Sequence, residues 1–226
     1  MNTYEQIADL AQERAALYRL LSTLYFKPLS NDQIEAIASS LQGDPVNVDS
    51  AFASAFQNMY AALRLRHTGT QEMLGADFTA TFYGTKTIDE RTAQPYESLY
   101  EPGNGQLMGK ARGEVFRTFK AAALRIPEGI DLPEDHLSFI FTYLARLCDK
   151  QAEQAEARDT ASLRQTTDDL RTFFAEHVQN WVPGYIEHAS RFVETRFYRG
   201  VLELTDVFIR EEGDTLEEMQ AALSTC

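Results

Sequence analysis

The sequence predicts an all-α protein, folded as a single-domain helical bundle of about eight to ten helices. Apolar residues recur at three- and four-residue steps through most of the chain, and no stretch alternates apolar and polar residues as a half-buried strand does. With 226 residues and a hydrophobic fraction of 44%, the chain can bury a sizeable core. We therefore expect residues 1–226 to form one all-helical domain.

Capping and stop signals divide the N-terminal third into separate helices, each with one apolar stripe. Pro28 closes the first stripe, and Ser30 with Gln33 forms a capping box at the start of the next helix. Thr70 is placed to cap a later helix. The stripes comprise Ile7, Leu10, Leu17, Leu20, Leu21 and Leu24, then Ile34, Ile37 and Leu41, and later Leu74, Phe78 and Phe82.

The helical period is lost over residues 83–105. Glycines and prolines punctuate this stretch, which predicts a long loop. Loops of this length in compact domains are often functional. The punctuating residues are Gly84, Pro95, Pro102, Gly103 and Gly105.

A second break in the pattern precedes a strongly apolar helix. Pro133 is placed as a first-turn proline, and Glu134 and Asp135 lie where the positive end of a helix favours acids. Residues 149–169 are polar, so we expect them to contribute little core and to serve as a candidate hinge.

Two further signals divide the C-terminal third. Pro183 and Gly184 predict a turn between helices. Thr215 and Glu218 form a capping pattern, preceded by acids that include Glu212, and predict the start of a last short helix.

Composition limits the classes of partner. The formal net charge is −13 and the pI is near 4.7, which disfavours nucleic acid because phosphate binding needs clustered Lys and Arg. A basic partner suits this surface, although solubility alone would also explain the acidity. The first residues lack the basic and apolar regions of a secretory signal, and apolar runs fall short of the about 20 residues that span a membrane. We expect a cytoplasmic protein without a membrane span.

Motifs for catalysis and cofactor binding are missing from the sequence. The four histidines show no zinc-binding HExxH spacing, the two cysteines no CxxC spacing, and no phosphate-binding loop occurs. We therefore expect no metal, no cofactor and no catalytic residue. One alternative stays open: Asp135 and His136 could be an acid/base pair in a metal- or nucleotide-dependent hydrolase, or simply a helix-dipole acid and a structural histidine.

Aromatic and acidic residues gather in and beside the predicted loop. This mixture suits an Arg-containing peptide, because carboxylates pair with guanidinium groups and aromatic faces stack on them. At helical spacing, Phe78 and Phe82 are expected to be core residues, whereas Tyr96 and Tyr100 in the loop fit either role. The gathered residues are Asp77, Phe78, Phe82, Tyr83, Tyr96, Glu97, Tyr100 and Glu101.

Several segments lie along the chain in a characteristic order and spacing: residues 78–84, 95–100, 107–109 and 132–137, followed by Phe174, His177, Trp181 and Pro183. Together they resemble the TorD-type family of redox-enzyme maturation chaperones, which includes the DmsD and NarJ branches. The resemblance covers nearly the whole chain. Two positions depart from the family pattern: Thr81 stands where Leu is usual, and Leu132 stands where Glu is usual.

The resemblance implies a cytoplasmic chaperone for maturation of a molybdopterin-containing oxidoreductase. Such a chaperone binds the twin-arginine signal peptide, or another segment, of the enzyme precursor until the cofactor is inserted. It also allows handling of the molybdenum cofactor or a guanine nucleotide. We expect the protein to be a monomer or a homodimer.

The same resemblance singles out the residues expected to bind the peptide. Asp135 and His136 match the family's Asp-His pair; we expect Asp135 to bind a cation or fix the adjoining loop, and His136 to orient it. Neither is expected to be catalytic. The full predicted set is Asp135, His136, Tyr96, Glu97, Ser98, Tyr100 and Phe82.

Overall fold

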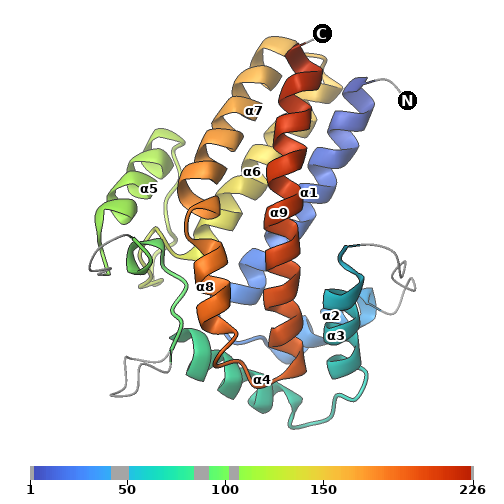
Figure 1. The fold of residues 1–226 in the computed structure, drawn as a ribbon, viewed down its shortest axis with the longest axis vertical. Helices are drawn as coiled ribbons and strands as arrows, with labels where there is room; N and C mark the ends of the chain where they lie inside the picture. The colour runs from blue at the N-terminus through green and yellow to red at the C-terminus, as the bar shows by residue number, and fades with distance from the viewer. Residues whose placement is uncertain (1–2, 42–50, 84–91, 102–106, 225–226) are drawn as a thin grey trace. The chain divides into compact units, whose positions relative to one another are not determined.

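The computed structural model describes residues 3–41, 51–83, 92–101 and 107–224 (Figure 1). Within these ranges the chain forms nine α-helices and no strand longer than an isolated bridge, so the all-α prediction is confirmed. The helices are α1 (Thr3–Phe26), α2 (Asn31–Ser40), α3 (Ala53–Leu63), α4 (Thr70–Phe78), α5 (Lys110–Ala121), α6 (Leu137–Glu156), α7 (Thr160–Phe174), α8 (Val182–Ala189) and α9 (Arg196–Ser224).

Three short helical turns that are wound more tightly or more widely than an α-helix complete the described helical structure. Two π-helical turns, η1 (Thr79–Tyr83) and η3 (Ala175–Gln179), directly follow α4 and α7. A 3-10 turn, η2 (Glu97–Leu99), lies in the predicted 83–105 loop, of which residues 84–91 and 102–105 lie outside the described part. Single π-helical turns are rare and often occur at functional sites.

The chain divides into two compact units. The first comprises residues 1–23, 96–182 and 209–226, and the second comprises residues 24–95 and 183–208. Each unit is assembled from segments distant in the sequence, so neither corresponds to a continuous stretch of chain. A single domain over residues 1–226 stays a prediction.

In the first unit, α1, α6, α7 and α9 bury their apolar faces against one another. Figure 1 shows α6 and α7 side by side, in agreement with their extensive contacts. Apolar residues of all four helices pack closely at one end of the unit. This cluster contains Ile7, Ala8, Ala155, Leu163, Met219 and Leu223.

A buried polar layer crosses this helical core. The Arg14 guanidinium donates to both carboxylate oxygens of Glu212, at 2.7 and 2.5 Å, and to the Gln151 side-chain oxygen at 2.9 Å. Gln151 in turn donates to the Thr167 hydroxyl at 2.7 Å, and Tyr18 donates to Glu212 at 2.8 Å. These bonds join α1, α6, α7 and α9, so the layer fixes which turns of the four helices face each other.

The polar stretch 149–169 contributes to the core, contrary to the prediction. Gln151 and Thr167 are fully buried, and their mutual hydrogen bond offsets the cost of burying these polar side chains. α7 starts behind Asp159, whose carboxylate accepts from the Ser162 amide at 3.1 Å. The prediction failed because the polar residues of this stretch were expected to be exposed, whereas several of them are buried. The use of this stretch as a hinge stays a prediction.

An aromatic cluster forms the core of the second unit. The Phe82 ring lies 5.7 Å from that of Tyr25, 5.3 Å from Phe78 and 5.5 Å from Tyr198, all at steep angles that aromatic pairs prefer. Phe82 is therefore a core residue, as its helical spacing predicted.

Helix ends in the second unit partly follow the predicted signals. The capping box of Ser30 and Gln33 is confirmed, with both reciprocal hydrogen bonds formed. Thr70 is not an N-cap: it is the first residue of α4 behind Gly69, and its hydroxyl accepts from the His67 amide at 2.8 Å.

The Asp77 carboxylate also holds a helix start. It accepts from the Glu194 amide at 3.0 Å and from the Thr195 amide and hydroxyl at 2.8 and 2.6 Å, directly ahead of α9. Asp77 is buried and its acceptor sites are occupied by these donors. Asp77 therefore stabilises the fold. Its grouping with the loop aromatics suggested that it could bind an arginine, but its oxygens are already engaged.

The predicted breaks in the C-terminal third were wrong. Pro183 lies in the first turn of α8, where a proline needs no amide hydrogen bond, and Gly184 continues that helix. Thr215 lies inside the 29-residue α9 and starts no new helix.

Close packing of α9 on α3 in the second unit depends on Gly200. A Cβ at this position would lie 2.8 Å from the Ala55 carbonyl oxygen and 3.0 Å from the Met59 amide nitrogen. We expect Gly200→Ala to lower the free energy of unfolding by about 1–3 kcal/mol, although alanine is the better helix former. Urea unfolding followed by circular dichroism measures this change.

Gly184→Ala is the matched control, because a Cβ there meets no atom within 4 Å. It should be neutral or stabilising. Equal effects of the two substitutions would contradict the close contact at Gly200.

Within residues 3–41, 51–83, 92–101 and 107–224, every helix falls short of the length and apolar character that spanning a bilayer requires.

Candidate functional site

A short antiparallel bridge in the first unit joins two of the predicted site segments. Tyr96 pairs with His136, and their rings meet edge to face with centroids 4.9 Å apart. The Glu97 amide donates to the Asp135 carbonyl at 3.2 Å, and the Ser98 amide donates to the Asp135 carboxylate at 3.0 Å. Asp135 thereby fixes the start of η2.

His136 begins α6 as its N-cap. Its Nδ1 accepts from the Ser138 amide at 3.2 Å and lies 2.8 Å from the Ser138 hydroxyl, so the neutral ring carries its proton on Nε2. Burial lowers the pKa of His136 to about 3, which keeps it neutral. The prediction of Pro133 as a first-turn residue was wrong: its carbonyl accepts from the His136 amide in a turn before the helix.

The Glu97 carboxylate faces His177 in the interior of the same unit. Its two oxygens lie 3.2 and 3.0 Å from His177 Nδ1, and both residues are buried. The π-helical turn η3 carries His177 to this position. Burial raises the pKa of Glu97, with the negative charge of Asp135 adding to the rise and the His177 ring opposing it.

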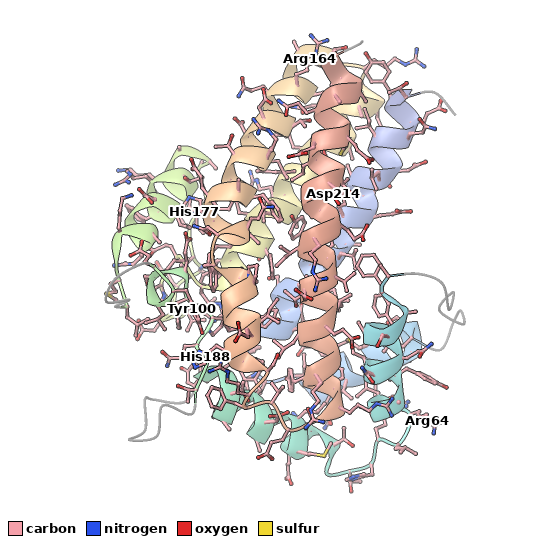
Figure 2. The ribbon with its side chains drawn as sticks, in the orientation of Figure 1. Arg64, Tyr100, Arg164, His177, His188 and Asp214 are labelled. Carbon is pink, nitrogen blue, oxygen red and sulfur yellow. The ribbon has the colours of Figure 1, made fainter. Side chains whose placement is uncertain are left out.

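Tyr100 directly follows η2 as its C-cap. Its ring stacks on Trp181, with centroids 5.4 Å apart and planes 30° apart, and the indole N–H of Trp181 donates to the His177 carbonyl at 2.7 Å. Tyr100 and His177 are labelled in Figure 2. Tyr100 is half-buried, whereas Tyr96, Glu97 and His136 are buried.

Two polar atoms at the centre of this cluster lack hydrogen-bond partners in the part of the chain that the structure describes. They are the second carboxylate oxygen of Asp135 and the hydroxyl of Ser98, on side chains that are 0% exposed. Buried acceptors without partners cost about 1–3 kcal/mol, and more when charged. Most buried polar groups have a partner, so these two atoms offer free acceptor sites for a ligand, although the described chain carries such atoms elsewhere too, on Gln154, Thr166 and Tyr198.

Two acids at the edge of the cluster bind α5. The Glu101 carboxylate accepts from the Ala111 amide at 2.6 Å, and Glu134 accepts from Arg112 at 2.7 Å. Both acids are partly buried, and these contacts join the segments on either side of the cluster to α5.

The structure gathers six of the seven predicted site residues into this cluster. Phe82 belongs to the second unit and its aromatic core. His177 was not in the predicted set, although the match of Phe174, His177 and Trp181 to the family segment marked the region. No group of three or more residues suited to holding a metal ion occurs among the residues that the structure describes.

Known proteins that this chain resembles along most of its length are chaperones. The chain is 26% identical to "Chaperone protein TorD" of Vibrio cholerae over 95% of its length and 97% of the relative. The protein of the same name from Vibrio parahaemolyticus is 26% identical, over 91% of this chain and 95% of the relative. That of Shewanella loihica is 24% identical, over 91% and 93%.

The family follows from a second match. The family described as "Nitrate reductase delta subunit" matches residues 47–187, and the chain belongs to it. The predicted TorD-like resemblance is confirmed, and the protein is a redox-enzyme maturation chaperone and not an enzyme. The hydrolase alternative for Asp135 and His136 is set aside on these relatives.

Proposed function

We propose that this protein is a cytoplasmic chaperone that binds the twin-arginine signal peptide of a molybdopterin-containing oxidoreductase precursor until its cofactor is inserted. Family membership supports the maturation role, and the net charge of −13 suits a basic ligand. Two adjacent arginines followed by apolar residues need both acidic and aromatic partners.

One observation carries the proposal most directly: the unpartnered carboxylate oxygen of Asp135. Beside it are the unpartnered Ser98 hydroxyl and the buried Glu97 carboxylate, whose charge interacts with that of Asp135. A guanidinium group offers five N–H donors and a positive charge, which would satisfy this acidic cluster.

The predicted site residues differ in burial, so we assign them different roles in peptide binding. Tyr100 is half-buried and would contact the peptide directly. Asp135, Ser98 and Glu97 would meet an arginine only after η2 shifts, and Tyr96 with His136 would hold the bridge that positions them. For Phe82 the proposed role is indirect, through the aromatic core of its own unit.

Calorimetry with twin-arginine signal peptides tests the proposal. We expect binding that weakens when the paired arginines are replaced by lysines, because lysine cannot form the planar bidentate contact. Asp135→Asn should weaken binding by about ten-fold or more, as expected for one charged hydrogen-bonded pair.

Asp131→Asn is the matched control, since it removes the same charge from an exposed site four residues earlier. Its affinity should stay within about two-fold of the wild type. No heat with any signal peptide, or an equal loss in both variants, would count against the proposal. A molybdoenzyme precursor that co-purifies from the native host would identify the client.

A further inference from the structure

Residues 107–125 reverse the charge balance of the chain. They contain five basic residues and only one of the chain's 34 acidic residues, Glu114. Lys110, Arg117, Lys120 and Arg125 are exposed on and beside α5. A local basic surface on a protein of net charge −13 is a specific feature, because solubility is already secured by the acids elsewhere.

Three large apolar side chains are exposed in the same stretch. Leu107 and Met108 are 48% and 63% exposed immediately before α5, and Phe116 is 48% exposed in its second turn. Apolar side chains gathered with cations on one segment mark a surface for a partner more often than scattered single residues do. We call this set of exposed basic and apolar residues the α5 face.

The opposite side of α5 is held in the first unit. Ala111, Val115 and Phe119 are buried, and the Phe119 ring lies 5.5 Å from that of Tyr143. The acids near the helix serve these attachments, through the bonds of Glu101 to the Ala111 amide and of Glu134 to Arg112. The helix is therefore a fixed support for its outer face.

Few acids neutralise the outer cations. Glu114 is 3.1 Å from Lys110 and 4.0 Å from Arg117. For Lys120 and Arg125 no ion-pair partner exists within the ranges that the structure describes. Much of the positive charge on the α5 face is thus free to act on a ligand.

A groove of about 810 Å³ lies beside the C-terminal end of α5. Ala121, Ala122 and Leu147 supply apolar lining, and Arg146 and Lys150 of α6 add two further cations. Three acids also line it: Asp149 pairs with Arg19, whereas Glu153 and Asp169, which accepts from the neutral Gln165 side chain, balance the charges of Arg146 and Lys150. The groove extends the α5 face with space for side chains of a ligand.

We propose that the α5 face binds an acidic amphipathic segment of a partner protein. Carboxylates of the partner pair with Lys110, Arg117 and Lys120, and its apolar residues cover Phe116 and the groove. The α5 face is basic, whereas the cluster around Asp135 is acidic. A doubly basic signal peptide would be repelled by the α5 face, so the two surfaces suit different ligands. The inference therefore stands without the proposed function.

A protein segment fits this surface better than an anionic membrane does. A membrane presents negative charge across a whole plane, and within a Debye length of about 8 Å it would also repel the acids that surround the α5 face. A single segment meets only the local cations. The partner we infer is thus acidic, apolar on one side and narrow.

Two synthetic helical peptides test the inference with the full-length chain. One carries Glu and Leu, the other carries Lys and Leu in the same arrangement, and fluorescence anisotropy measures binding of each. We expect the Glu/Leu peptide to bind at least about ten-fold more tightly and its affinity to fall with salt. Reversing two exposed charges, by Arg117→Glu with Lys120→Glu, should weaken it by about ten-fold.

Phe116→Ser is a second variant, expected to weaken the Glu/Leu peptide without changing the charge. Lys27→Glu with Arg64→Glu is the charge-matched control, because both residues are exposed and lie in the second unit. Its affinity should equal that of the wild type. No binding, equal affinity for both peptides, an equal loss in the control, or tighter binding to phosphatidylglycerol vesicles would each overturn the proposal.

Discussion

Glu212→Ala is expected to lower the free energy of unfolding by about 3–5 kcal/mol, because it leaves the Arg14 guanidinium buried without its counter-charge. The two side chains are only 4% and 1% exposed, so water cannot replace the lost carboxylate in the folded state. Tyr18 would also lose its acceptor. Urea unfolding measures the loss.

A double variant separates the burial penalty from the value of the pair. Arg14→Met with Glu212→Leu removes both charges and should recover most of the lost stability, since apolar residues of similar size often replace a buried pair without loss. A single Glu212→Ala variant that loses less than about 1 kcal/mol would show that Arg14 is compensated in another way.

The stability of the protein is expected to fall on acidification because of His136. Its folded-state pKa of about 3 lies below the value of 6.5 for an unperturbed histidine. Above pH 6.5 the residue is neutral in both states and its contribution is complete. As the pH falls towards 3, the unfolded chain binds a proton that the folded chain excludes, and about 4 kcal/mol is lost.

His136→Asn isolates this contribution. The asparagine oxygen can still accept from the Ser138 amide at the N-cap, but the side chain does not titrate. The variant should lose stability less steeply between pH 6.5 and 3 than the wild type, whatever its stability at neutral pH. Parallel slopes in urea unfolding at a series of pH values would show that His136 binds its proton equally in both states.

Local signals in the sequence were enough for much of the fold. The apolar stripes predicted the helices, and Ser30 with Gln33 predicted a cap that forms as expected, because these interactions join residues a few positions apart. Errors arose where distant contacts decide the structure. Glu212 resembled an acid ahead of a new helix, yet it lies inside α9 and pairs with Arg14, 198 positions away.

Six of the seven residues predicted for the site lie in one cluster, but their burial was not predicted, and their role in binding a peptide stays a prediction. The motifs at 95–100 and 132–137 were recognised separately, and the structure joins them through the Tyr96–His136 bridge. The partner of Glu97 could not be derived locally, because His177 lies 80 positions away. Composition suggested an acidic surface, but Glu97 and Asp135 are interior acids whose placement depends on those distant partners.

Trp181 gives this protein an optical reporter of its own. It is the chain's single tryptophan, it is buried, and its ring stacks on Tyr100 beside η2. Any movement of that tyrosine changes the surroundings of one defined indole, so emission intensity and wavelength would follow the segment in real time without an added dye. Ligand occupancy near Tyr100 could thus be read from the unlabelled molecule.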